Sequence, residues 1–537
     1  MIIGNFVYAK QLCSANLVVF LMTVRIILSV PFFCLLLFGN LAAQRVEVKW
    51  GEDKDAAKVK ASGLIGRDTS GFYVYRLNRH HDSYIRIDGY SFEDYSRRQT
   101  LNVDLPTLGK RATQFERIFL LNEHFLLFTS FLDLENNQHL AFASLLDKQG
   151  NYVKAMVPVD KIEDVTNHKN AGHFAFRLSP DSSYLMAFHN TPFRRYQNAS
   201  FSVKLFDASL NPLWQRMFRM PYPDEDFEVV TAIADNQQDV FMVCRHHGKG
   251  AMRGAEAGAN KKYTLVHYSH LDRRLTEFEI KVDNKWIHSA RFSLTNDSTL
   301  VAAGFYSGSS QGNIAGTFLV RFNTRSGDVV NHGFEPLPRD VMIAVTSNDE
   351  LLYGGLASFE MKKMLVRPDE SIVLIAEKDY VTTSSYFDPY TGQRLITYNY
   401  HYEDVLVTSL SPEGVLEWAR VVPKSQVSAN DPSLYGSIAV NQYADKTYIV
   451  FNDHPANANV VRQPGQVRTL SNYTRSVGVI ATIDRNGKMT TEALFSSGDF
   501  DAILRPDFCS EHENARQIIY GESSGKDKFG EIFYPEN

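Results

Sequence analysis

One pattern recurs along the chain and limits its possible folds more than any other feature. An apolar, strand-like segment is followed by a short polar turn and then by a second apolar segment. Asp, Asn, Ser or Pro marks each turn, as in the connections between antiparallel strands. The abundant Phe and Tyr, 36 and 26 residues, also suit a pleated sheet. Copies of this first hairpin lie at 176–188, 232–245, 292–306, 344–356 and 443–453.

A second hairpin pattern follows several copies of the first. It consists of a strand, an Asp, Asn or Ser with further turn residues that often include Gly, and another strand. Asp and Asn close such turns by side-chain to backbone hydrogen bonds, and Gly adopts the positive φ that they require. Its copies lie at 145–155, 205–215, 268–278, 320–330, 385–395, 408–420 and 481–494. Two hairpins make four strands, which is the plan of a propeller blade.

We therefore predict an all-β chain that folds as a single β-propeller of about seven four-stranded blades within residues 44–500. The segments at 71–77 and 84–92 should form the first hairpin, and 46–50 a strand that closes the ring with the last blade. Residues 501–537 are expected to be a C-terminal extension packed on the propeller. The alternative is two β domains in tandem, although no Pro- or Ser-rich linker separates two halves.

The segment FRLSPDSSYLMAF at 176–188 resembles the SPDG-type turn of WD40-like and TolB-like propeller repeats. It departs from that pattern at Ser182, where Gly is usual. The paired hairpins, with a leader and a closing strand, resemble exported propeller proteins of uncharacterised function from Bacteroidetes-type bacteria. Propellers of this kind include binding scaffolds and some enzymes, so the resemblance implies a fold and carries no site residue across.

The first residues have the features of a signal peptide. Arg25 supplies a basic start, 26–38 an apolar stretch, and small residues precede a cut before Gln44. We predict a leader at 1–43, with 1–21 reflecting an early start codon. The alternative is an uncleaved membrane anchor. The expected location is therefore exported, that is, periplasmic, cell-surface or secreted.

The charge of the chain argues against nucleic-acid binding. The full chain has a net charge of −5 from 56 basic and 61 acidic side chains. Without the leader, which holds Lys10 and Arg25 and no acid, 54 basic side chains face 61 acidic ones and the charge is −7. A mildly acidic protein has no electrostatic drive toward phosphate backbones.

No linear motif predicts catalysis, a cofactor or a metal. The Gly-x-Ser-x-Gly segments at 308–312 and 521–525 resemble a nucleophile elbow, but an elbow needs a strand-to-helix turn with an acid and a His later in the chain. The first lies in a loop between strands, and no His follows the second. Cys244 and Cys509 form either one disulfide or two buried thiols, and no Cys/His spacing matches a zinc site.

Two acidic features each have a functional interpretation and a purely structural one. Asp224, Glu225 and Asp226 form an acidic loop, for which we expect solvation rather than the opposed carboxyls of a glycosidase. Glu377 follows an apolar strand and either faces the central channel or simply ends the strand.

The strongest binding candidate is the basic, Gly-rich segment 245–262, which should be a loop on one rim. Arg245, His246, His247 and Lys249 are its candidate binding residues, for an anionic ligand or for the acidic surface of a partner. The alternative is a solvated insertion.

These observations favour a non-catalytic binding or scaffold protein of the cell envelope, which presents rim loops to a protein or glycan partner. An alternative is an enzyme that acts on an exported glycan or peptide through a site in the central channel. A third is a ligand-sensing subunit of a membrane assembly. The expected partners are an envelope protein or glycan, without nucleic acid, and a membrane only through an uncleaved leader. The oligomeric state stays open.

Overall fold

The computed structural model describes residues 45–536 except for 53, 56–58, 79–82, 195, 247–261, 281–284, 297–298, 310–311, 327, 347–354, 391, 459–461, 510–514 and 524–525. Within these residues the strands form eight antiparallel sheets of four or five strands and one two-stranded ribbon. Neighbours in each sheet are consecutive in the chain, apart from the sheet that joins the two ends and one short strand, Gln426–Ala429, that pairs with a strand two places before it. The predicted leader at 1–43 lies outside the described residues.

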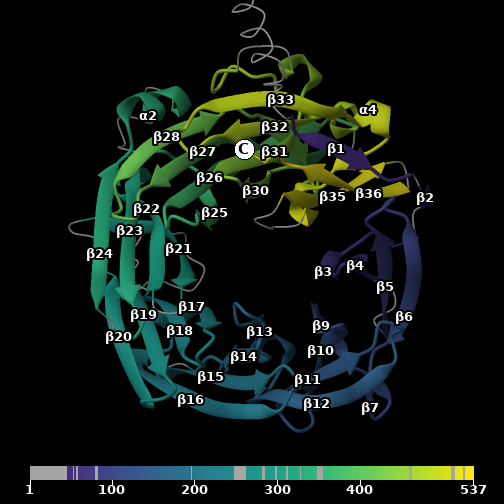
Figure 1. Ribbon diagram of the computed structural model, residues 1–537, viewed down its shortest axis with the longest axis vertical. Coiled ribbons are helices and arrows are strands. Elements are labelled where there is room, and N and C mark those ends of the chain that lie inside the picture. Colours follow the sequence, from purple (N-terminus) through teal and green to yellow (C-terminus); the bar gives the residue numbers. More distant parts are fainter. Residues whose placement is uncertain are drawn as a thin grey trace, which may run out of the picture. The chain divides into compact units, whose positions relative to one another are not determined.

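The first four sheets follow one another in chain order (Figure 1). They comprise β3 (Gly63–Arg67), β4 (Gly71–Leu77), β5 (Tyr84–Ser91) and β6 (Arg97–Asp104); β9 (Gln114–Leu121), β10 (His124–Asp133), β11 (Gln138–Leu146) and β12 (Tyr152–Glu163); β13 (Phe174–Leu178), β14 (Tyr184–Asn190), β15 (Asn198–Asp207) and β16 (Pro212–Pro223); and β17 (Phe227–Ala234), β18 (Val240–His246), β19 (Lys262–Ser269) and β20 (Arg274–Ile280). A small ribbon of β7 (Thr107–Leu108) and β8 (Arg111–Ala112) lies between the first two sheets in the sequence.

The remaining four sheets complete the series. They comprise β21 (Trp286–Asn296), β22 (Thr299–Ser307), β23 (Ile314–Asn323) and β24 (Val329–Pro336); β25 (Phe359–Val366), β26 (Ile372–Asp388), β27 (Gln393–Leu410) and β28 (Leu416–Val422), with β29 (Gln426–Ala429) on β27; β30 (Ala439–Tyr443), β31 (Lys446–Asp453), β32 (Val477–Ile483) and β33 (Met489–Ser496); and β34 (Ile503–Leu504), β35 (Arg516–Ser523), β36 (Lys526–Phe533) and β1 (Glu47–Trp50), with β2 (Lys54–Asp55) also on β36. The described helices are short: α2 (Arg339–Val345), α4 (Ser497–Phe500), η1 (His168–Asn170), η2 (Pro455–Asn457), η3 (Tyr473–Arg475) and η4 (Pro506–Phe508).

Asp residues close the turns inside the sheets, as the sequence predicts. Asp147 Oδ1 accepts hydrogen bonds from the backbone N–H groups of Gln149 and Asn151, at 2.9 and 2.8 Å. Between them Gly150 has a φ of 85°, the left-handed conformation that glycine adopts without strain. The same pattern of bonds recurs at Asp207, Asp235 and Asp484. The repeated residue type therefore produces a repeated turn.

Apolar clusters join each sheet to the next around the ring. The first and second sheets share a core that includes Ile85 and Leu127, and the second and third share one that includes Phe128 and Phe176. Similar clusters bridge every later pair, and Phe72 packs with Phe529 between the first and eighth sheets. Each fully buried Phe contributes about 1.5–3 kcal/mol through the area it removes from water. The continuous series of shared cores is that of one propeller, so the alternative of two tandem domains is wrong.

The two ends of the described chain meet in the eighth sheet. β1 pairs antiparallel with β36, from Glu47 opposite Phe533 to Trp50 opposite Gly530. This confirms the predicted closing strand at 46–50. Seven sheets lie within residues 44–500, in agreement with the predicted number, and residues 503–533 supply three strands of the eighth. The segment that we expected to be an extension on the propeller is therefore part of it.

One predicted hairpin is wrong in part. The sequence pattern at 344–356 indicated two strands, but its first two residues belong to the helix α2, Arg339–Val345, and 347–354 lie outside the described residues. Val341 and Val345 lie four residues apart on this helix, and both are buried in the core between the fifth and sixth sheets. The first strand of the sixth sheet, β25, begins only at Phe359. The spacing of the two valines is that of residues on one face of a helix.

The two cysteines beyond the leader are free and buried. Burial raises the pKa of the Cys509 thiol to about 12 and that of Cys244 still further, so neither is a thiolate at neutral pH. Of the two alternatives that the sequence left open, the structure has the pair of buried thiols. Within the described residues, no helix has the length and the apolar character that crossing a bilayer requires.

Candidate functional site

Arg245 and His246, the two candidate residues of the predicted rim loop that the structure describes, contact their own sheet and Tyr222 of the third sheet. The Arg245 guanidinium lies 2.5 Å from Glu228 Oε2. His246 Nε2 lies 2.8 Å from Thr264 Oγ1, and its ring meets that of Tyr222 edge-on. His247 and Lys249 lie outside the described residues. Docking of an anionic ligand at this loop therefore stays a prediction, with two of its four residues already engaged by neighbours.

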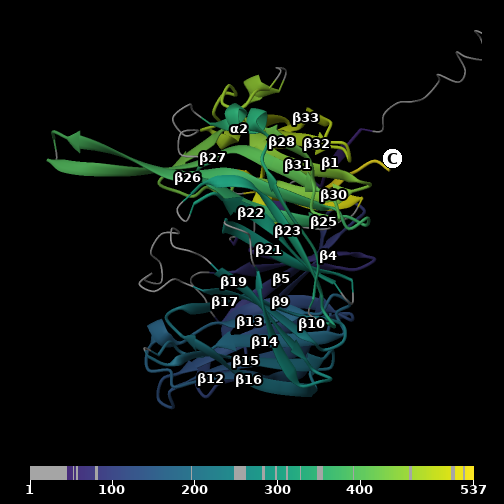
Figure 2. The same ribbon diagram turned by 90° about the vertical axis from the view of Figure 1, so that its left-hand side faces the viewer.

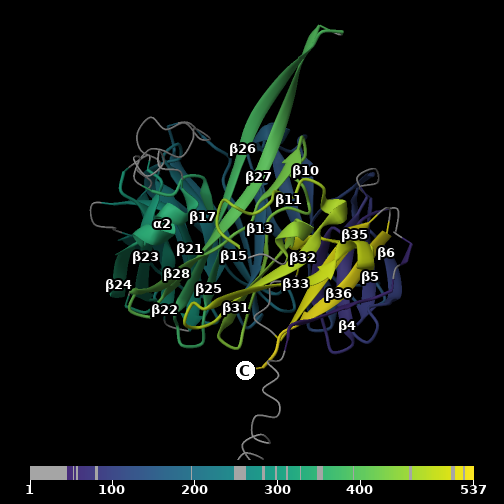
Figure 3. The same cartoon turned by 90° about the horizontal axis from the view of Figure 1, so that it is seen from above.

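A different segment presents the extended surface that a binding protein needs. β26 and β27 begin as central strands of the sixth sheet and then continue together beyond it (Figures 2 and 3). The first six residues of β26, 372–377, are buried, and its residues 381–387 are exposed. We call the exposed part of this hairpin the arm, residues 381–390 and 392–400. The predicted hairpin at 385–395 is its tip.

The arm is a two-stranded ribbon along most of its length. β25 pairs with β26 only as far as Lys378, and β29 pairs with β27 only from Asn399 to Tyr402. Beyond these points the described strands pair only with each other, up to Asp388 opposite Gln393. At the tip Asp388 Oδ1 accepts the N–H of Tyr390 at 2.9 Å, which holds the turn.

The register gives the arm one mainly apolar face, the apolar face, and a second, more polar face, the polar face, which still carries Tyr386 and Leu395, 62% and 51% exposed. Residues opposite each other on antiparallel strands point to the same side of the ribbon. One face carries the pairs Val381–Tyr400, Thr383–Tyr398, Ser385–Ile396 and Phe387–Arg394, and the other carries Thr382–Asn399, Ser384–Thr397 and Tyr386–Leu395. On the apolar face Phe387 is 63% exposed and Ile396 is 50% exposed, and Tyr390 at the tip is 97% exposed.

A buried ion-pair network holds the base of the arm, and Glu377 is its centre. The Glu377 carboxylate is fully buried and lies 2.7 Å from Lys424 Nζ and 3.4 Å from Lys362 Nζ. The Ser437 hydroxyl donates a further hydrogen bond to it. Lys362 also pairs with Asp379 at 2.7 Å. Glu377 therefore does not present a free carboxylate to the channel; it joins β25, β26 and the segments after β28.

Lys424 extends this network toward the seventh and eighth sheets. Its ammonium donates to the backbone oxygen of Tyr402 at 2.9 Å and to Gln426 Oε1 at 3.0 Å. Gln426 Nε2 donates in turn to the backbone oxygen of Asn452 at 2.6 Å. Asn452 Nδ2 bonds to the backbone oxygen of Leu504 at 2.8 Å. The arm is therefore fixed to three consecutive sheets by buried polar groups that have partners.

Burial shifts the pKa values at the base. It lowers the pKa of Lys424, although the Glu377 carboxylate opposes the shift. Burial alone would also lower the pKa of Lys362, but the carboxylates of Glu377 and Asp379 outweigh it and raise that pKa. Asp404, whose Oδ1 accepts the backbone N–H of Lys424, has its pKa raised to about 6 by burial. The base of the arm is therefore sensitive to pH near neutrality.

A Thr–His–Glu arrangement on the polar face of the arm has the order of a catalytic relay but not its geometry. Thr382 Oγ1 lies 2.9 Å from His401 Nε2. His401 Nδ1 lies 3.9 Å from Glu403 Oε1, beyond hydrogen-bonding distance. The hydroxyl is on an exposed strand, and the His401 ring is stacked on Tyr380 at 4.5 Å. These contacts stiffen the ribbon and do not activate a nucleophile.

The other motifs of the sequence also lie in ordinary strand connections and loops. In the two Gly-x-Ser-x-Gly segments, 310–311 and 524–525 lie outside the described residues. The next described element after each segment is a strand, β23 and β36, and not the helix that an elbow needs. Asp224 accepts the backbone N–H of Arg194 at 3.0 Å and so braces a neighbouring loop. Within the part of the chain that the structure describes, no group of three His, Cys, Asp or Glu side chains is arranged to hold a metal ion.

The sequence patterns predicted the turn at the tip of the arm but did not predict the arm itself. The signal for the arm was the length of the two segments that flank this turn, because β26 has 17 residues and β27 has 18. The typical strand has about 5–6 residues. The stretch from Ile396 to Tyr402 also alternates between apolar or aromatic and polar residues well outside any turn.

Comparisons with known proteins identify similar solved structures at low sequence identity. No family model matches the chain. No curated protein matches it either. Among solved structures, the chain is similar to the Dos1 propeller, at 8% identity and a TM-score of 0.43, with 91% of this chain and 96% of that one covered. It is also similar to the WD40 domain of SCAP from fission yeast, at 7% identity and 0.38, with 91% and 98% covered. A third is the β-propeller domain of the Trilobed protease from Pyrococcus furiosus, at 8% identity and 0.35, with 82% and 98% covered.

Proposed function

We propose that this protein is a non-catalytic binding scaffold of the cell envelope, and that the arm is its contact with a protein partner. The observation that carries the proposal is the exposed apolar face of a ribbon that projects from the propeller. Phe387, Ile396 and Tyr398 lie on this face, each with about half or more of its surface in water. Aromatic side chains in such positions are typical of the centres of protein interfaces.

The energetics of the arm support a partner. A two-stranded hairpin alone is marginally stable in water, and the arm has no third strand between Val381 and Tyr398. Its apolar face therefore adds little to the stability of the free protein. Covering that face would remove apolar area from water at about 25 cal/mol per Å². A protein surface supplies that area better than a glycan, whose hydroxyls would lose hydrogen bonds against Phe and Ile.

The rigid base supports binding in a second way. Binding loses free energy when flexible segments must be ordered, and a contact surface that is already ordered avoids part of that loss. The Glu377–Lys424 pair and its hydrogen bonds hold β26 and β27 in one direction where they leave the sheet. An envelope location is the part of the proposal that comes from the predicted leader alone.

Site-specific photo-crosslinking in the cells of origin tests the proposal. A photoreactive amino acid at Ile396 samples the apolar face, and the same amino acid at Ser384 samples the polar face as a matched control. We expect one protein species to crosslink at Ile396 and not at Ser384. The identified protein is then purified and mixed with the full chain. Its affinity should fall at least tenfold when Ile396→Thr and Tyr398→Ser are combined.

Three results contradict the proposal. Equal crosslinking at both positions would mean non-specific contact. Crosslinks only to a second copy of this chain would make the arm a self-association element rather than a contact for another protein. An unchanged affinity of the double variant for the purified protein would place the contact elsewhere. Circular dichroism of the variant checks that the propeller is intact in each case.

A further inference from the structure

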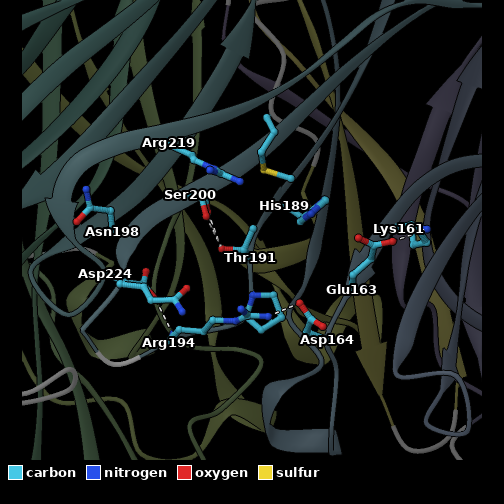
Figure 4. Close-up of a pocket in the computed structure, with 13 residues that line it drawn as sticks. Lys161, Glu163, Asp164, His189, Thr191, Arg194, Asn198, Ser200, Arg219 and Asp224 are labelled. Carbon is cyan, nitrogen blue, oxygen red and sulfur yellow. Dashed lines mark hydrogen bonds and ion pairs between the residues drawn. The ribbon is translucent and has the colours of Figure 1, made fainter.

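A polar cavity between the second and third sheets lies apart from the arm in the sequence and in its chemistry. Its volume is about 600 Å³, within the range of small-molecule sites. β12, β14, β15 and β16 supply its walls, together with the loops that follow β12, β14 and β16 (Figure 4). The lining residues are Lys161, Glu163, Asp164, His189, Thr191, Pro192, Arg194, Gln197, Asn198, Ser200, Met217, Arg219 and Asp224.

A buried His–Asp pair forms one wall of this cavity. His189 is only 2% exposed, and its Nδ1 lies 2.5 Å from Asp160 Oδ2. The other oxygen of Asp160 lies 3.1 Å from Lys204 Nζ. Because Nδ1 is held by the carboxylate, the ring orientation is fixed and Nε2 is the nitrogen left for a ligand. Asp160 and Lys204 thus position a ring that itself lines the cavity.

Hydrogen bonds hold the described residues of the loop over the cavity. Asp224 accepts the backbone N–H of Arg194 at 3.0 Å and donates its own backbone N–H to the backbone oxygen of Gln197 at 2.8 Å. Thr191 Oγ1 lies 2.9 Å from Ser200 Oγ, which ties the start of the loop to β15. A ligand would therefore meet hydroxyl and amide groups that are already in place.

The charges of the lining select a ligand with one negative group. Lys161 pairs with Glu163 at 2.6 Å, and the guanidinium of Arg194 pairs with Asp164. Arg219 forms no ion pair with any other described residue; it lies opposite Ser200 in the sheet, beside Thr191 and His189 (Figure 4). The carboxylates of the lining would repel a ligand with two or more negative charges. A single guanidinium instead suits one carboxylate, which it binds through two parallel hydrogen bonds.

We propose that this cavity binds an acidic saccharide, a sugar that carries one carboxylate as a uronic acid does. Arg219 binds the carboxylate, and His189, Asn198 and the hydroxyl groups of Thr191 and Ser200 bind the ring hydroxyls. The lining has few apolar groups, Met217 and Pro192, so an apolar or aromatic ligand would displace water from the polar groups of the lining without replacing its hydrogen bonds. This inference goes beyond the proposed function, since it concerns a second ligand at a site that shares no residue with the arm.

Isothermal titration of the purified full chain tests the proposal. The probes are glucuronic acid, a linear tetragalacturonate, glucose as the neutral analogue and glucose 6-phosphate as the dianionic one. We expect glucuronic acid to bind at least tenfold more tightly than glucose or glucose 6-phosphate. Tighter binding of tetragalacturonate would identify a polymer as the source of the sugar, and equal binding would identify the free sugar. Either result supports the site.

Two variants on the same strand make the test specific. Arg219→Gln removes the unpaired guanidinium and should weaken glucuronic acid binding at least tenfold. Arg216→Gln removes the same charge from the opposite face of β16, where Arg216 bonds to the Tyr268 hydroxyl at 3.0 Å, and should leave the affinity unchanged. Equal loss in both variants, equal affinity for glucose, or tighter binding of the phosphate would overturn the proposal. The Ile396→Thr variant should bind glucuronic acid normally, so a failure here is separate from a failure of the arm.

Discussion

The arm and the cavity are opposite kinds of surface built from the same fold. The arm extends two strands of one sheet into water and exposes an apolar face. The cavity lies between two sheets and is lined by polar and charged groups. Both depend on a buried charged group behind them: Glu377 with Lys424 at the base of the arm, and Asp160 with His189 and Lys204 behind the cavity.

This contrast indicates what the buried charges of the propeller do. They do not contact the expected partner or ligand, but fix the backbone or the ring that does. A buried ion pair adds little net stability compared with a well-packed apolar group, yet breaking one is costly. The pairs are therefore best explained by the geometry that they impose. If that is so, their removal should affect stability strongly, whereas changes on the exposed surfaces should affect binding alone.

The largest effect is expected at Lys424. Lys424→Met removes the nearer cation from Glu377 and leaves only Lys362, at 3.4 Å. The unfolding free energy should fall by about 3–5 kcal/mol, the usual result of leaving a buried charge without its partner. Urea unfolding followed by tryptophan fluorescence measures it. Lys378→Met, which removes a partly exposed partner of Glu403, should cost less than about 1 kcal/mol. Equal losses in the two variants would refute a special role for the buried pair.

A pH-dependent effect of about 3 kcal/mol is expected at Asp404. Its pKa is raised from 3.8 to about 6 in the folded protein, so the folded state holds a proton that the unfolded chain releases between these values. The wild type therefore loses stability as the pH rises from about 4 through 6. Asp404→Asn stays neutral and should match the wild type near pH 4 and exceed it above pH 7. Unfolding free energies at both pH values measure the difference, and parallel pH profiles would contradict the shift.

The fold could be predicted from the sequence further than either surface could. Turn residues such as Asp147 and Asp207 act locally, so their hydrogen bonds follow from a few neighbouring residues. The closing strand was also predicted at 46–50, and β1 pairs there with the last strand of the ring. The helix α2 was missed because the spacing of Val341 and Val345 matters only against the core that they join.

Neither site could be read from linear spacing. Asp160 and His189 lie 29 residues apart and meet only because successive sheets pack side by side. Glu377 was singled out as a channel residue or a strand end, but its main partner, Lys424, lies at the start of a segment that showed no motif. The predicted basic loop, by contrast, was conspicuous in sequence, and its described candidate residues, Arg245 and His246, are engaged by neighbouring side chains. The composition shows how many charged side chains the chain has, whereas function depends on which of them have no partner after folding.

A moderate loss of stability is expected from Asp160→Asn. The amide keeps the shape of the carboxylate but leaves Lys204 and His189 without a negative partner. The unfolding free energy should fall by about 1–3 kcal/mol. Affinity for glucuronic acid should also fall, although Asp160 is not among the lining residues. Lys161→Gln, an adjacent change at an exposed pair, should alter stability by less than about 0.5 kcal/mol. An Asp160→Asn variant with unchanged affinity would show that His189 is held by its packing alone.

The smallest effect on stability is expected on the arm, and one strand supplies both the test and its control. Ile396 and Val407 lie on β27, the first 50% exposed and the second fully buried. Ile396→Thr should change the unfolding free energy by less than about 0.5 kcal/mol, because the face it alters is already in water. Val407→Thr places a hydroxyl in the core and should cost about 1–3 kcal/mol. Binding of the partner should show the reverse order. It should be lost in Ile396→Thr and retained in Val407→Thr, measured at temperatures where Val407→Thr is folded. If Ile396→Thr were as destabilising as Val407→Thr, the apolar face of the arm would be part of the folded core, and the reason for assigning it to a partner would disappear.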